Sequence, residues 1–478
     1  MLSVSGPADR TNLSGSFRRR KGLTVPTPAA TRTERASSPE APLTLAEAPP
    51  KVLGFLDQFG LWANFGISLL IPVVVVFFVP TSLVAQIAAV AAGTVLGCAL
   101  VGAVAAIGAQ QGAPTMVLFR GLFGRGGSYL PTALNIAQCL GWATFEVWII
   151  SVAAQQVWND APRWSFVVLA GAIATAMALR PLGSAKLLKR IAVVAVVLCS
   201  AYFLFEAGSQ PLGDLTAGGW SGFWTNLDLV IAMSVSWIPL VADYSRHGRR
   251  SRATGLAVGL GYGVASAAFF LVGVLGIRAY SPDDGDIIGA LLAVPVGALA
   301  LAILAIDELD QAFANIYSTA VSAQNALPRA DRRVLALLVG AVATALGLLV
   351  SDGYAYEGFL LLIGAVFTPL GAVVVIDYYL LRRGRYDLGA AAPQRWIMLV
   401  PWLAGFAAYQ LIAPTYVSNW SAWQSFWFDA QDRLGISATN GFSAAITSFA
   451  VAGALTLLLG RIGRAGADPA ALRRARSR

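Results

Sequence analysis

Residues 140–149, LGWATFEVWI, hold a single carboxylate, Glu146, in an otherwise apolar run between Trp142 and Trp148. A carboxylate at the centre of a membrane helix costs about 2.5–3.5 kcal/mol, so such residues are rare and mark candidate functional sites. Trp142 and Glu146 are four residues apart, which places an indole and a carboxylate on one helical face. This pair suits a flat aromatic ligand with donors on its edge. The alternative is a packing tryptophan beside a carboxylate that pairs with another helix.

The composition is that of a membrane protein. Of the 478 residues, 57% are hydrophobic and 12% are charged, and the mean hydropathy is +0.66. A helix needs about 20 apolar residues to cross a bilayer, and such runs recur along the chain. We predict an all-α polytopic membrane protein with twelve transmembrane helices. The predicted spans are 60–79, 83–108, 132–157, 164–180, 190–208, 225–242, 254–277, 291–318, 334–350, 357–381, 396–412 and 441–460.

The basic residues predict that both termini are cytoplasmic, because Lys and Arg concentrate in cytoplasmic loops. In that orientation only Arg163, Arg278 and Arg433 of the 34 Lys and Arg residues lie outside. The net charge of +9 is therefore spread over all the cytoplasmic loops, which argues against nucleic-acid binding. The expected partners are the lipid bilayer of the plasma membrane and a small molecule, and the oligomeric state is left open.

Three regions follow from this pattern. Residues 1–50 are rich in Ser, Pro, Ala and Arg and are predicted to be a disordered cytoplasmic tail. Residues 51–460 form the transmembrane domain, and residues 461–478 form a basic cytoplasmic tail. The aromatic stretch between the last two spans, 413–440, is predicted to lie at the outer membrane surface as an interfacial belt.

Two spans contain helix breakers. The first span carries Pro72 after Asn64 and Gly66, and the sixth carries Pro239 directly after its polar stretch. Proline removes a backbone donor, and non-helical backbone at membrane depth persists only where it lines a cavity. Two interrupted helices in corresponding positions of two halves mark the central site of a transporter. We therefore predict a five-plus-five inverted repeat with discontinuous helices 1 and 6, plus two C-terminal helices.

The eighth span is unusually acidic. In AIDELDQAFANIYSTAVSAQN, residues 305–325, Asp307 and Asp310 share one helical face, while Glu308, Gln311 and Asn315 share a neighbouring face. The third and eighth spans correspond in the predicted repeat, so their acids should meet the two broken helices near the centre. Glu206, Asp243 and Asp377 lie near span ends, where structural roles are expected.

These segments resemble the nucleobase–cation symporter family one, which includes the purine and cytosine permeases. The resemblance covers about residues 50–390 and is closest to the hydroxymethylpyrimidine and cytosine permease-like branch. The matching stretches are LWANFGISLLIP in span 1, GWATFEVW in span 3, SVSWIPLVADYSRHGR in span 6, FANIYSTAVS in span 8 and VVVIDYYLLRRG in span 10.

The resemblance implies transport of a heterocyclic base with a cation by alternating access. Trp142 matches the stacking tryptophan of span 3, Asn315 matches the substrate-binding asparagine of span 8, and Glu146 stands where members usually have Gln. An acid there only accepts hydrogen bonds and so favours bases that offer donors, such as a cytosine-like or guanine-like base, over uracil. The predicted substrate-binding residues are Trp142, Glu146, Asn315, Trp237, Ser236, Ser234, Asn64 and Gln311.

The coupling ion is left open between Na⁺ and H⁺. Sodium-coupled members of the family place two hydroxyl residues in span 8, whereas the matching positions here are Leu309 and Asp310. Leu309 offers only its carbonyl, and Asp310 is able to bind Na⁺ or to carry a proton. Ile306 and Gly66 complete the predicted cation site.

We predict a secondary active symporter that imports a nucleobase or related aminopyrimidine, with no cofactor and no catalytic residue. The alternative is an amino-acid or other small-molecule transporter of the same inverted-repeat fold, against which span 1 lacks a Gly-x-Gly sequence. A membrane enzyme is disfavoured, because the sequence has no His pair, Ser-x-x-Lys or Asp-rich metal motif near the membrane interface.

Overall fold

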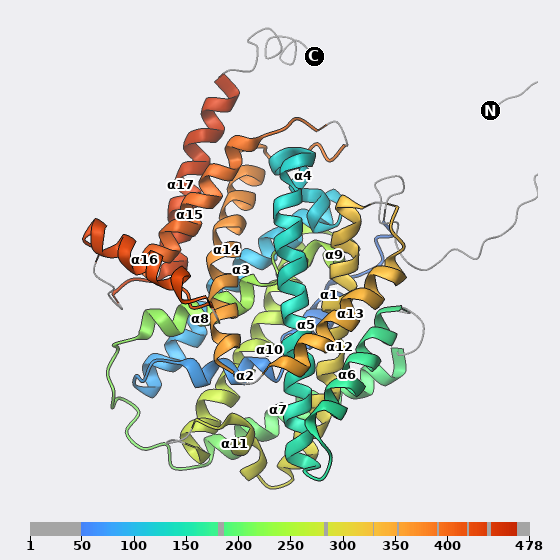
Figure 1. The fold of residues 1–478 in the computed structure, drawn as a ribbon, viewed down its shortest axis with the longest axis vertical. Coiled ribbons are helices and arrows are strands. Elements are labelled where there is room, and N and C mark those ends of the chain that lie inside the picture. Colours follow the sequence, from blue (N-terminus) through green and yellow to red (C-terminus); the bar gives the residue numbers. More distant parts are fainter. Residues whose placement is uncertain are drawn as a thin grey trace, which may run out of the picture. The chain divides into compact units, whose positions relative to one another are not determined.

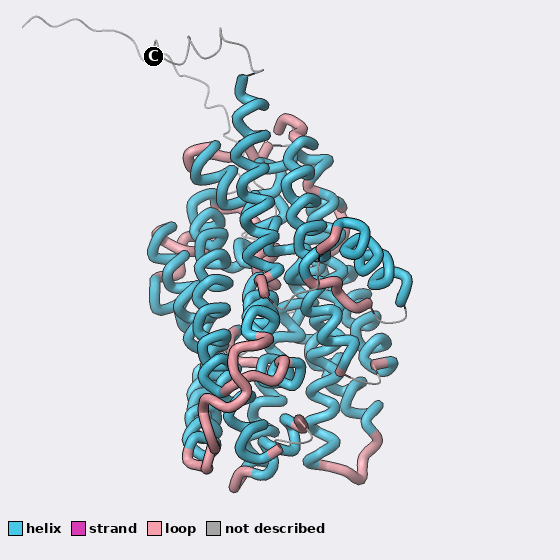
Figure 2. The backbone as a smooth tube through the Cα atoms, turned by 90° about the vertical axis from the view of Figure 1, so that its left-hand side faces the viewer, coloured by secondary structure: helices cyan, strands magenta, loops and turns pink. Residues whose placement is uncertain are grey.

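The described part of the chain consists of helices joined by loops (Figure 2). The computed structural model describes residues 49–179, 186–281, 285–327, 329–350, 353–389, 392–417, 420–436 and 441–465. Within these ranges the only β-pairing is one isolated bridge between Leu53 and Gly248. The all-α prediction is therefore confirmed for these residues, and most of the two predicted tails, 1–48 and 466–478, lies outside them.

All the described helices belong to one compact unit (Figure 1). They are α1 (Phe55–Phe65), α2 (Leu70–Val74), the 3₁₀-helix η1 (Val75–Phe77), α3 (Leu83–Gln111), α4 (Thr115–Gly127), α5 (Tyr129–Val157), α6 (Arg163–Leu179), α7 (Lys186–Gly208), α8 (Phe223–Val235), α9 (Val241–Ser245), α10 (Ser251–Tyr280), α11 (Ile287–Ala293), α12 (Gly297–Ala326), α13 (Arg332–Leu349), α14 (Tyr354–Val375), the π-helix η2 (Ile376–Leu381), the 3₁₀-helix η3 (Trp396–Met398), α15 (Leu399–Ile412), α16 (Ser421–Leu434) and α17 (Ala444–Ala465).

Each predicted span coincides with a described helix. Five helices are long and apolar enough to cross a membrane by themselves, namely α3, α5, α10, α13 and α14 with η2, and the bent pair α1 and α2–η1 makes a sixth. Shorter apolar helices lie at five other predicted spans. The remaining span falls on α12, which has 30 residues and carries three carboxylates. The chain is thus a multi-pass helical membrane protein, while the count of twelve crossings stays a prediction.

The first span is interrupted between α1 and α2, whose axes are bent by 51°. Pro72 lies in the first turn of α2, where a backbone N–H has no partner within the helix, so proline is tolerated there. Gly66 ends α1 against α10, and a Cβ at this position would come within 2.6 Å of the Tyr262 carbonyl oxygen. The lack of a side chain at Gly66 therefore lets α10 pack directly against the break.

The sixth span is interrupted as well. Helix α8 ends at Val235, a turn follows, and α9 begins at Val241. Pro239 lies within this turn and cannot continue the helix of α8. Both predicted breaks are therefore present in the structure, and each lies directly before or around a proline.

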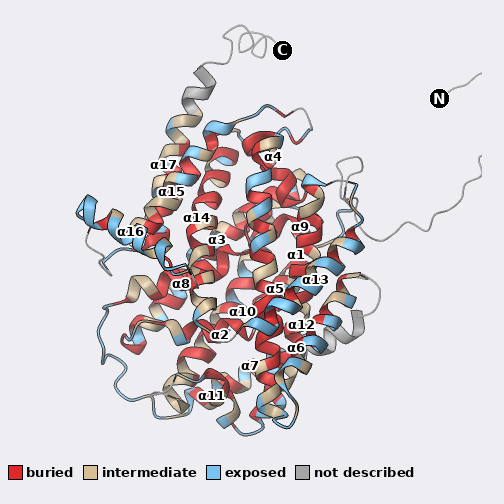
Figure 3. Ribbon diagram, viewed as in Figure 1, coloured by how far each residue is buried: buried red, intermediate tan, exposed pale blue. Residues whose placement is uncertain are grey.

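The helices around the breaks pack as two groups. The first group, which we call the core group, contains α1–α2, α3, α8–α9 and α10; the second, the scaffold group, contains α5, α6, α12 and α13. Three close pairs, α3 with α10, α5 with α12 and α6 with α13, each join predicted spans that are five apart. Buried residues occur in helices of both groups and line the interior of the bundle (Figure 3).

Small residues allow the core group to pack closely. Gly102 of α3 and Gly255 of α10 face each other, and a Cβ on either would lie 2.6 Å from the carbonyl oxygen of the other. Gly97 of α3 meets Ser234 of α8 in the same way, at 2.5 Å from its Cβ. Glycine at such crossings is typical of membrane helices, because lipid supplies no hydrophobic drive and contact area must come from backbone approach.

Helices α14, α15 and α17 pack together beside α8, with α16 next to α15 (Figure 1). The buried Asp228 of α8 joins this outer set to the sixth span. Its carboxylate accepts hydrogen bonds from the Ser443 hydroxyl and from the backbone N–H groups of Ala444, at 2.7 Å, and Ala445, at 3.2 Å. Asp228 therefore caps the N-terminus of α17 with an acid, the charge that a helix N-terminus favours.

Two of the acids near span ends have structural partners. Asp243 accepts a hydrogen bond from the backbone N–H of Thr115, at 2.9 Å, which joins α9 to α4. Asp377 forms a two-bond pair with Arg395, at 2.7 and 2.8 Å, and is fully buried. Arg395 also donates through its side chain to the Gly121 carbonyl, so the pair holds the chain after η2 against α4.

Replacing Asp377 with Asn should destabilise the protein strongly. The change leaves the Arg395 guanidinium without its charged partner, and breaking a buried ion pair costs about 3–5 kcal/mol. The expected result is a clearly lower thermal unfolding midpoint in detergent, measured by intrinsic fluorescence. Asp387→Asn, an exposed acid in the same connection, is the matched control, and equal midpoints for the two variants would contradict a stabilising role for the pair.

Candidate functional site

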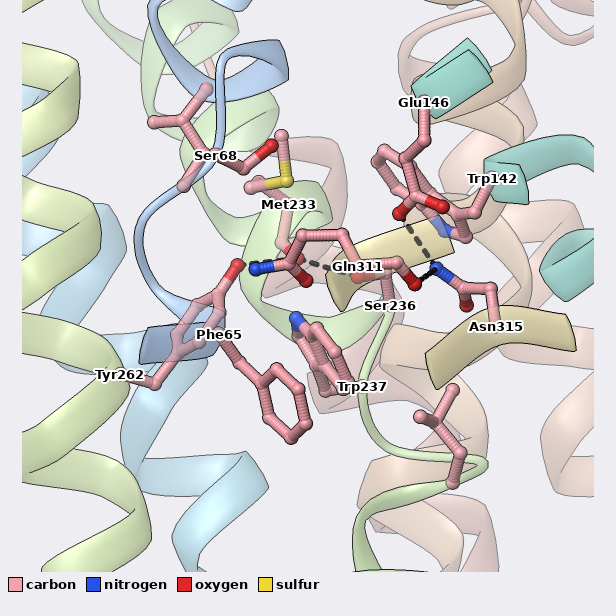
Figure 4. Close-up of a pocket in the computed structure, with 12 residues that line it drawn as sticks. Phe65, Ser68, Trp142, Glu146, Met233, Ser236, Trp237, Tyr262, Gln311 and Asn315 are labelled. Atoms are coloured by element: carbon pink, nitrogen blue, oxygen red, sulfur yellow. Dashed lines mark hydrogen bonds between the residues drawn. The ribbon is translucent and has the colours of Figure 1, made fainter. Parts of the chain in front are cut away.

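A cavity lies between the two helix breaks (Figure 4). About 360 Å³ of non-atom space lies within it, part of which is open to solvent. Its walls come from α1–α2, α5, α8 and the turn after it, α10 and α12. The lining residues are Phe65, Ser68, Ile71, Trp142, Glu146, Met233, Ser236, Trp237, Leu240, Tyr262, Gln311 and Asn315.

The carboxylate of Glu146 is held by the eighth span. Asn315 donates from Nδ2 to Glu146 Oε1 at 2.7 Å, and the two residues are 4% and 3% exposed (Figure 4). Glu146 Oε2 is buried and has no hydrogen-bond partner among the described residues, and the same is true of Trp142 Nε1. A buried carboxylate oxygen without a donor is costly. The wall therefore presents one unsatisfied acceptor and one unsatisfied donor.

Aromatic rings form much of the remaining wall. Trp237, in the turn after α8, stacks on Phe65 with ring centroids 4.9 Å apart and an angle of 21° between the planes. Trp142 makes edge contacts with Tyr356 and Phe359 of α14, at 5.8 and 5.4 Å. Both indoles are thus fixed by neighbouring rings, and each offers flat apolar surface to the cavity.

One face of α12 closes the break of the first span. The Glu308 carboxylate accepts from the Ser68 hydroxyl and from the Leu69 backbone N–H, each at 2.7 Å. Gln311 donates from Nε2 to the carbonyls of Ile67, at 3.0 Å, and Asn64, at 3.3 Å. Side chains of α12 therefore satisfy backbone groups that the missing helical turn leaves open.

Six of the eight predicted substrate-binding residues line this cavity. They are Trp142, Glu146, Ser236, Trp237, Gln311 and Asn315. The other two are not on its wall. Ser234 faces α3, with its hydroxyl 3.7 Å from Cys98 Sγ, and Asn64 contributes its backbone carbonyl to Gln311. The roles of all eight in binding remain proposals.

The four predicted cation residues do not form one cluster. Gly66 lies against Tyr262 and Ala265 of α10. Ile306 is 67% exposed, and with Leu309 it lines a separate apolar pocket beside α5 and α6. Asp310 is partly exposed and does not line the central cavity. The polar face of α12 that turns to the first span is instead the face of Glu308, Gln311 and Asn315.

Several wall residues carry no signal in the sequence. Phe65, Tyr262 and Met233 are apolar or aromatic residues in apolar helices, so nothing in the local pattern distinguishes them from packing residues. Ser68 lies in the interrupted stretch and belongs to a recognisable polar run. Glu308 is conspicuous as an acid in a membrane span, but its contact with the first span depends on the rotation of α12.

Two broken spanning helices on either side of a central cavity are the architecture of a membrane transporter. Residues 57–395 match the family described as permease for cytosine/purines, uracil, thiamine, allantoin. The chain therefore belongs to this permease family, and the predicted resemblance to the nucleobase–cation symporters is confirmed.

Individual relatives agree with this assignment. The cytosine permease of Escherichia coli (strain K12) is 23% identical over 310 residues, which cover 63% of this chain and 72% of that protein. The putative purine-cytosine permease YxlA of Bacillus subtilis (strain 168) is 24% identical over 363 residues, 70% of this chain and 78% of that protein.

Among solved structures, Mhp1, a nucleobase-cation-symport-1 family transporter in a closed conformation with bromovinylhydantoin bound, is similar in fold. It superposes with a TM-score of 0.65 and 17% identity over 86% of this chain and 100% of that one.

Gln311→Leu should destabilise the break of the first span. Leucine is of similar size but leaves the carbonyls of Ile67 and Asn64 without a donor, which costs about 1–3 kcal/mol. We expect a lower thermal midpoint and faster hydrogen exchange in residues 66–71. Gln324→Leu, on the same helix but bonded to the loop at Ala330, is the control. Unchanged exchange in residues 66–71 of the Gln311 variant would contradict this account.

Proposed function

We propose that this permease imports a nucleobase that bears an exocyclic amino group, such as cytosine or an aminopurine, together with a cation. The observation that carries the proposal is the buried Glu146 Oε2, which lines the cavity and has no donor among the described residues. An amino group on the ring edge is a donor of the required kind. Relatives in the same family are named as cytosine and purine-cytosine permeases, which supports this substrate class.

The rest of the wall is consistent with a planar guest. Trp237 and Trp142 offer aromatic surface for the ring faces, and Trp142 Nε1 is an unsatisfied donor for a carbonyl or ring nitrogen of the base. Asn315 keeps Glu146 Oε1 occupied and so directs the open Oε2 toward the guest. Amino-bearing bases combine a donor and an acceptor on one edge, whereas an amino acid would require a site for its carboxylate, which Glu146 would repel.

Alternating access would move the core group against the scaffold group. Near the cavity the contacts between these groups include the bonds of Glu308 to Ser68 and Leu69, and the bond from Gln138 Nε2 to the Ser236 carbonyl at 2.9 Å. The close pairing of helices predicted to be five spans apart supports a five-plus-five inverted repeat. We propose this repeat with two additional C-terminal helices, twelve crossings and cytoplasmic termini.

A ligand panel tests the substrate class. Purified protein should be stabilised against heating by cytosine or adenine and not by amino acids, because a ligand at 100 times its Kd adds about 2.7 kcal/mol to the folded state. The measurement is the thermal midpoint in the presence of purines, pyrimidines, hydantoins and amino acids. Stabilisation by amino acids with none by any heterocycle would reject the proposal in favour of the amino-acid alternative.

Glu146→Gln should change which bases compete. The amide retains an oxygen for Asn315 but loses the charged acceptor, and a hydrogen bond to a charged group contributes about 1.5–3 kcal/mol. We expect cytosine to bind at least about ten-fold more weakly, with uracil affected less, in competition against labelled cytosine. Glu357→Gln, a carboxylate in the first turn of α14 that does not line the cavity, is the control. If the competing bases keep the same order of affinity in the Glu146 variant, this carboxylate does not determine which base binds.

A further inference from the structure

We propose that Glu308 binds the coupling proton. In a sodium-coupled carrier the ion would lie against the carbonyls of the interrupted first span, and here the side-chain amide of Gln311 occupies that position. This inference rests on the proposed function, because it assigns the cation that accompanies the base. It also moves the coupling residue from Asp310, the sequence-based candidate, to its neighbour on the face of α12 that turns to the first span.

The contacts of Glu308 link the two helix groups. The residue is 1% exposed, and each of its oxygens accepts one hydrogen bond from the break, from the Ser68 hydroxyl and the Leu69 backbone N–H. Both bonds favour an ionised carboxylate, which accepts only. Adding a proton turns one carboxylate oxygen into a donor and weakens at least one of these bonds. The protonation state of Glu308 therefore sets how firmly α12 holds the start of α2.

The two carboxylates of this region, Glu308 and Glu146, are buried. Among the described residues, Glu308 and Glu146 make no ion pair or hydrogen bond with Lys, Arg or His. The titratable groups on other helices that face Glu308 are Glu146 of α5 and Tyr356 of α14. On α12 itself, Asp307 and Asp310 lie beside it in the sequence, on a neighbouring face of the helix. Helices α6, α7, α11 and α13 also pack on α12, and none of their described residues bonds to Glu308. Two carboxylates beside one cavity repel each other, and a proton on one of them removes this repulsion.

The place for a metal cation is already filled by a side chain. In carriers with discontinuous helices, the carbonyls of the unwound segment coordinate the sodium ion. Here the carbonyls of Ile67 and Asn64 both accept from Gln311 Nε2. An amide nitrogen carries two protons, and two hydrogen bonds to carbonyls use both of them. Sodium would have to displace the amide, whereas a proton needs only a carboxylate oxygen, which Glu308 provides at the same break.

One polar row connects the proton to the base. Glu308, Gln311 and Asn315 lie on one face of α12 at helical spacing, and Asn315 donates to Glu146. Binding of a proton at Glu308 removes one of the two like charges and so makes the ionised form of Glu146 more favourable for an amino-bearing base. The proton and the base therefore bind more tightly together than apart, which is the requirement for symport.

The test uses the purified full-length chain in proteoliposomes with radiolabelled cytosine and, separately, radiolabelled adenine. One arm applies an acid-outside pH gradient of one unit in choline buffer without sodium, and a second applies a sodium gradient at equal pH. A third measures exchange of external label for internal unlabelled base with no gradient. The proteins are the wild type, Glu308→Gln, Asp310→Asn and the control Glu357→Gln.

A one-unit gradient can drive about ten-fold accumulation when one proton accompanies each base. We expect the wild type and Glu357→Gln to accumulate label with the pH gradient alone, and Glu308→Gln to fall to no accumulation while still exchanging label. Glutamine keeps a carbonyl oxygen for the Leu69 N–H, so the variant should fold, which the thermal midpoint checks. Three results would overturn the proposal. The first is accumulation that a sodium gradient alone drives, and the second is accumulation that Glu308→Gln retains under the pH gradient. The third is accumulation that Asp310→Asn loses while Glu308→Gln keeps it.

A measurement without substrate separates this inference from the proposed function. Trp62, Trp142 and Trp237 lie around the break and the cavity, so tryptophan emission should change as Glu308 takes up a proton. We expect a pH-dependent change in the wild type that is equal in sodium and choline chloride and is missing in Glu308→Gln. If no base is transported but this result holds, the substrate assignment fails and the proton site stands. An emission change that follows sodium, or that persists in Glu308→Gln, would reject the proton site.

Discussion

The structure depends on one constraint, which is that backbone groups exposed by an open helical turn in the membrane must find partners inside the protein. Lipid offers no hydrogen bonds, so each break in a spanning helix has to be closed by side chains or by a bound guest. At the first span this task falls to Glu308 and Gln311 of α12, which bond to both the donors and the acceptors of the gap. The acid and the amide that the eighth span carries on this face thus form hydrogen bonds with the first span rather than within their own helix.

The same constraint explains why the cavity is where it is. The second break, after α8, receives the Gln138 amide at the Ser236 carbonyl, and the turn carries Trp237 into the space beside Phe65. The two helix breaks face each other across the cavity. The wall of this cavity combines indole, carboxylate and amide groups. A small planar molecule with polar edges and apolar faces matches that wall better than a flexible or highly charged one.

Much of this arrangement could be predicted from the sequence, because the informative residues contrast with their surroundings. Glu146 and Asn315 are polar in apolar helices, and Pro72 and Pro239 are breakers in spanning segments, so they identify four helices and their meeting point. The rotation of α12 could not be predicted, because Asp307 and Asp310 differ from Glu308 and Gln311 by only about 100° around the axis. In the same way, Ser234 and Ser236 have the same chemistry, but only the second lies beyond the end of α8 and reaches the cavity. Phe65 and Tyr262 were missed because an aromatic residue among apolar neighbours has no contrast.

The acid cap that α8 places on α17 has a consequence for the outer helices. Asp228 lies on the first half of the broken sixth span and holds the first turn of α17 through three donors. In the proposed transport cycle, a tilt of the sixth span would either carry α17 along or break these hydrogen bonds, which is costly inside a membrane. The peripheral helices are thus hydrogen-bonded to a helix of the core group, and under the proposed mechanism a rigid partner bound to α17 would slow transport.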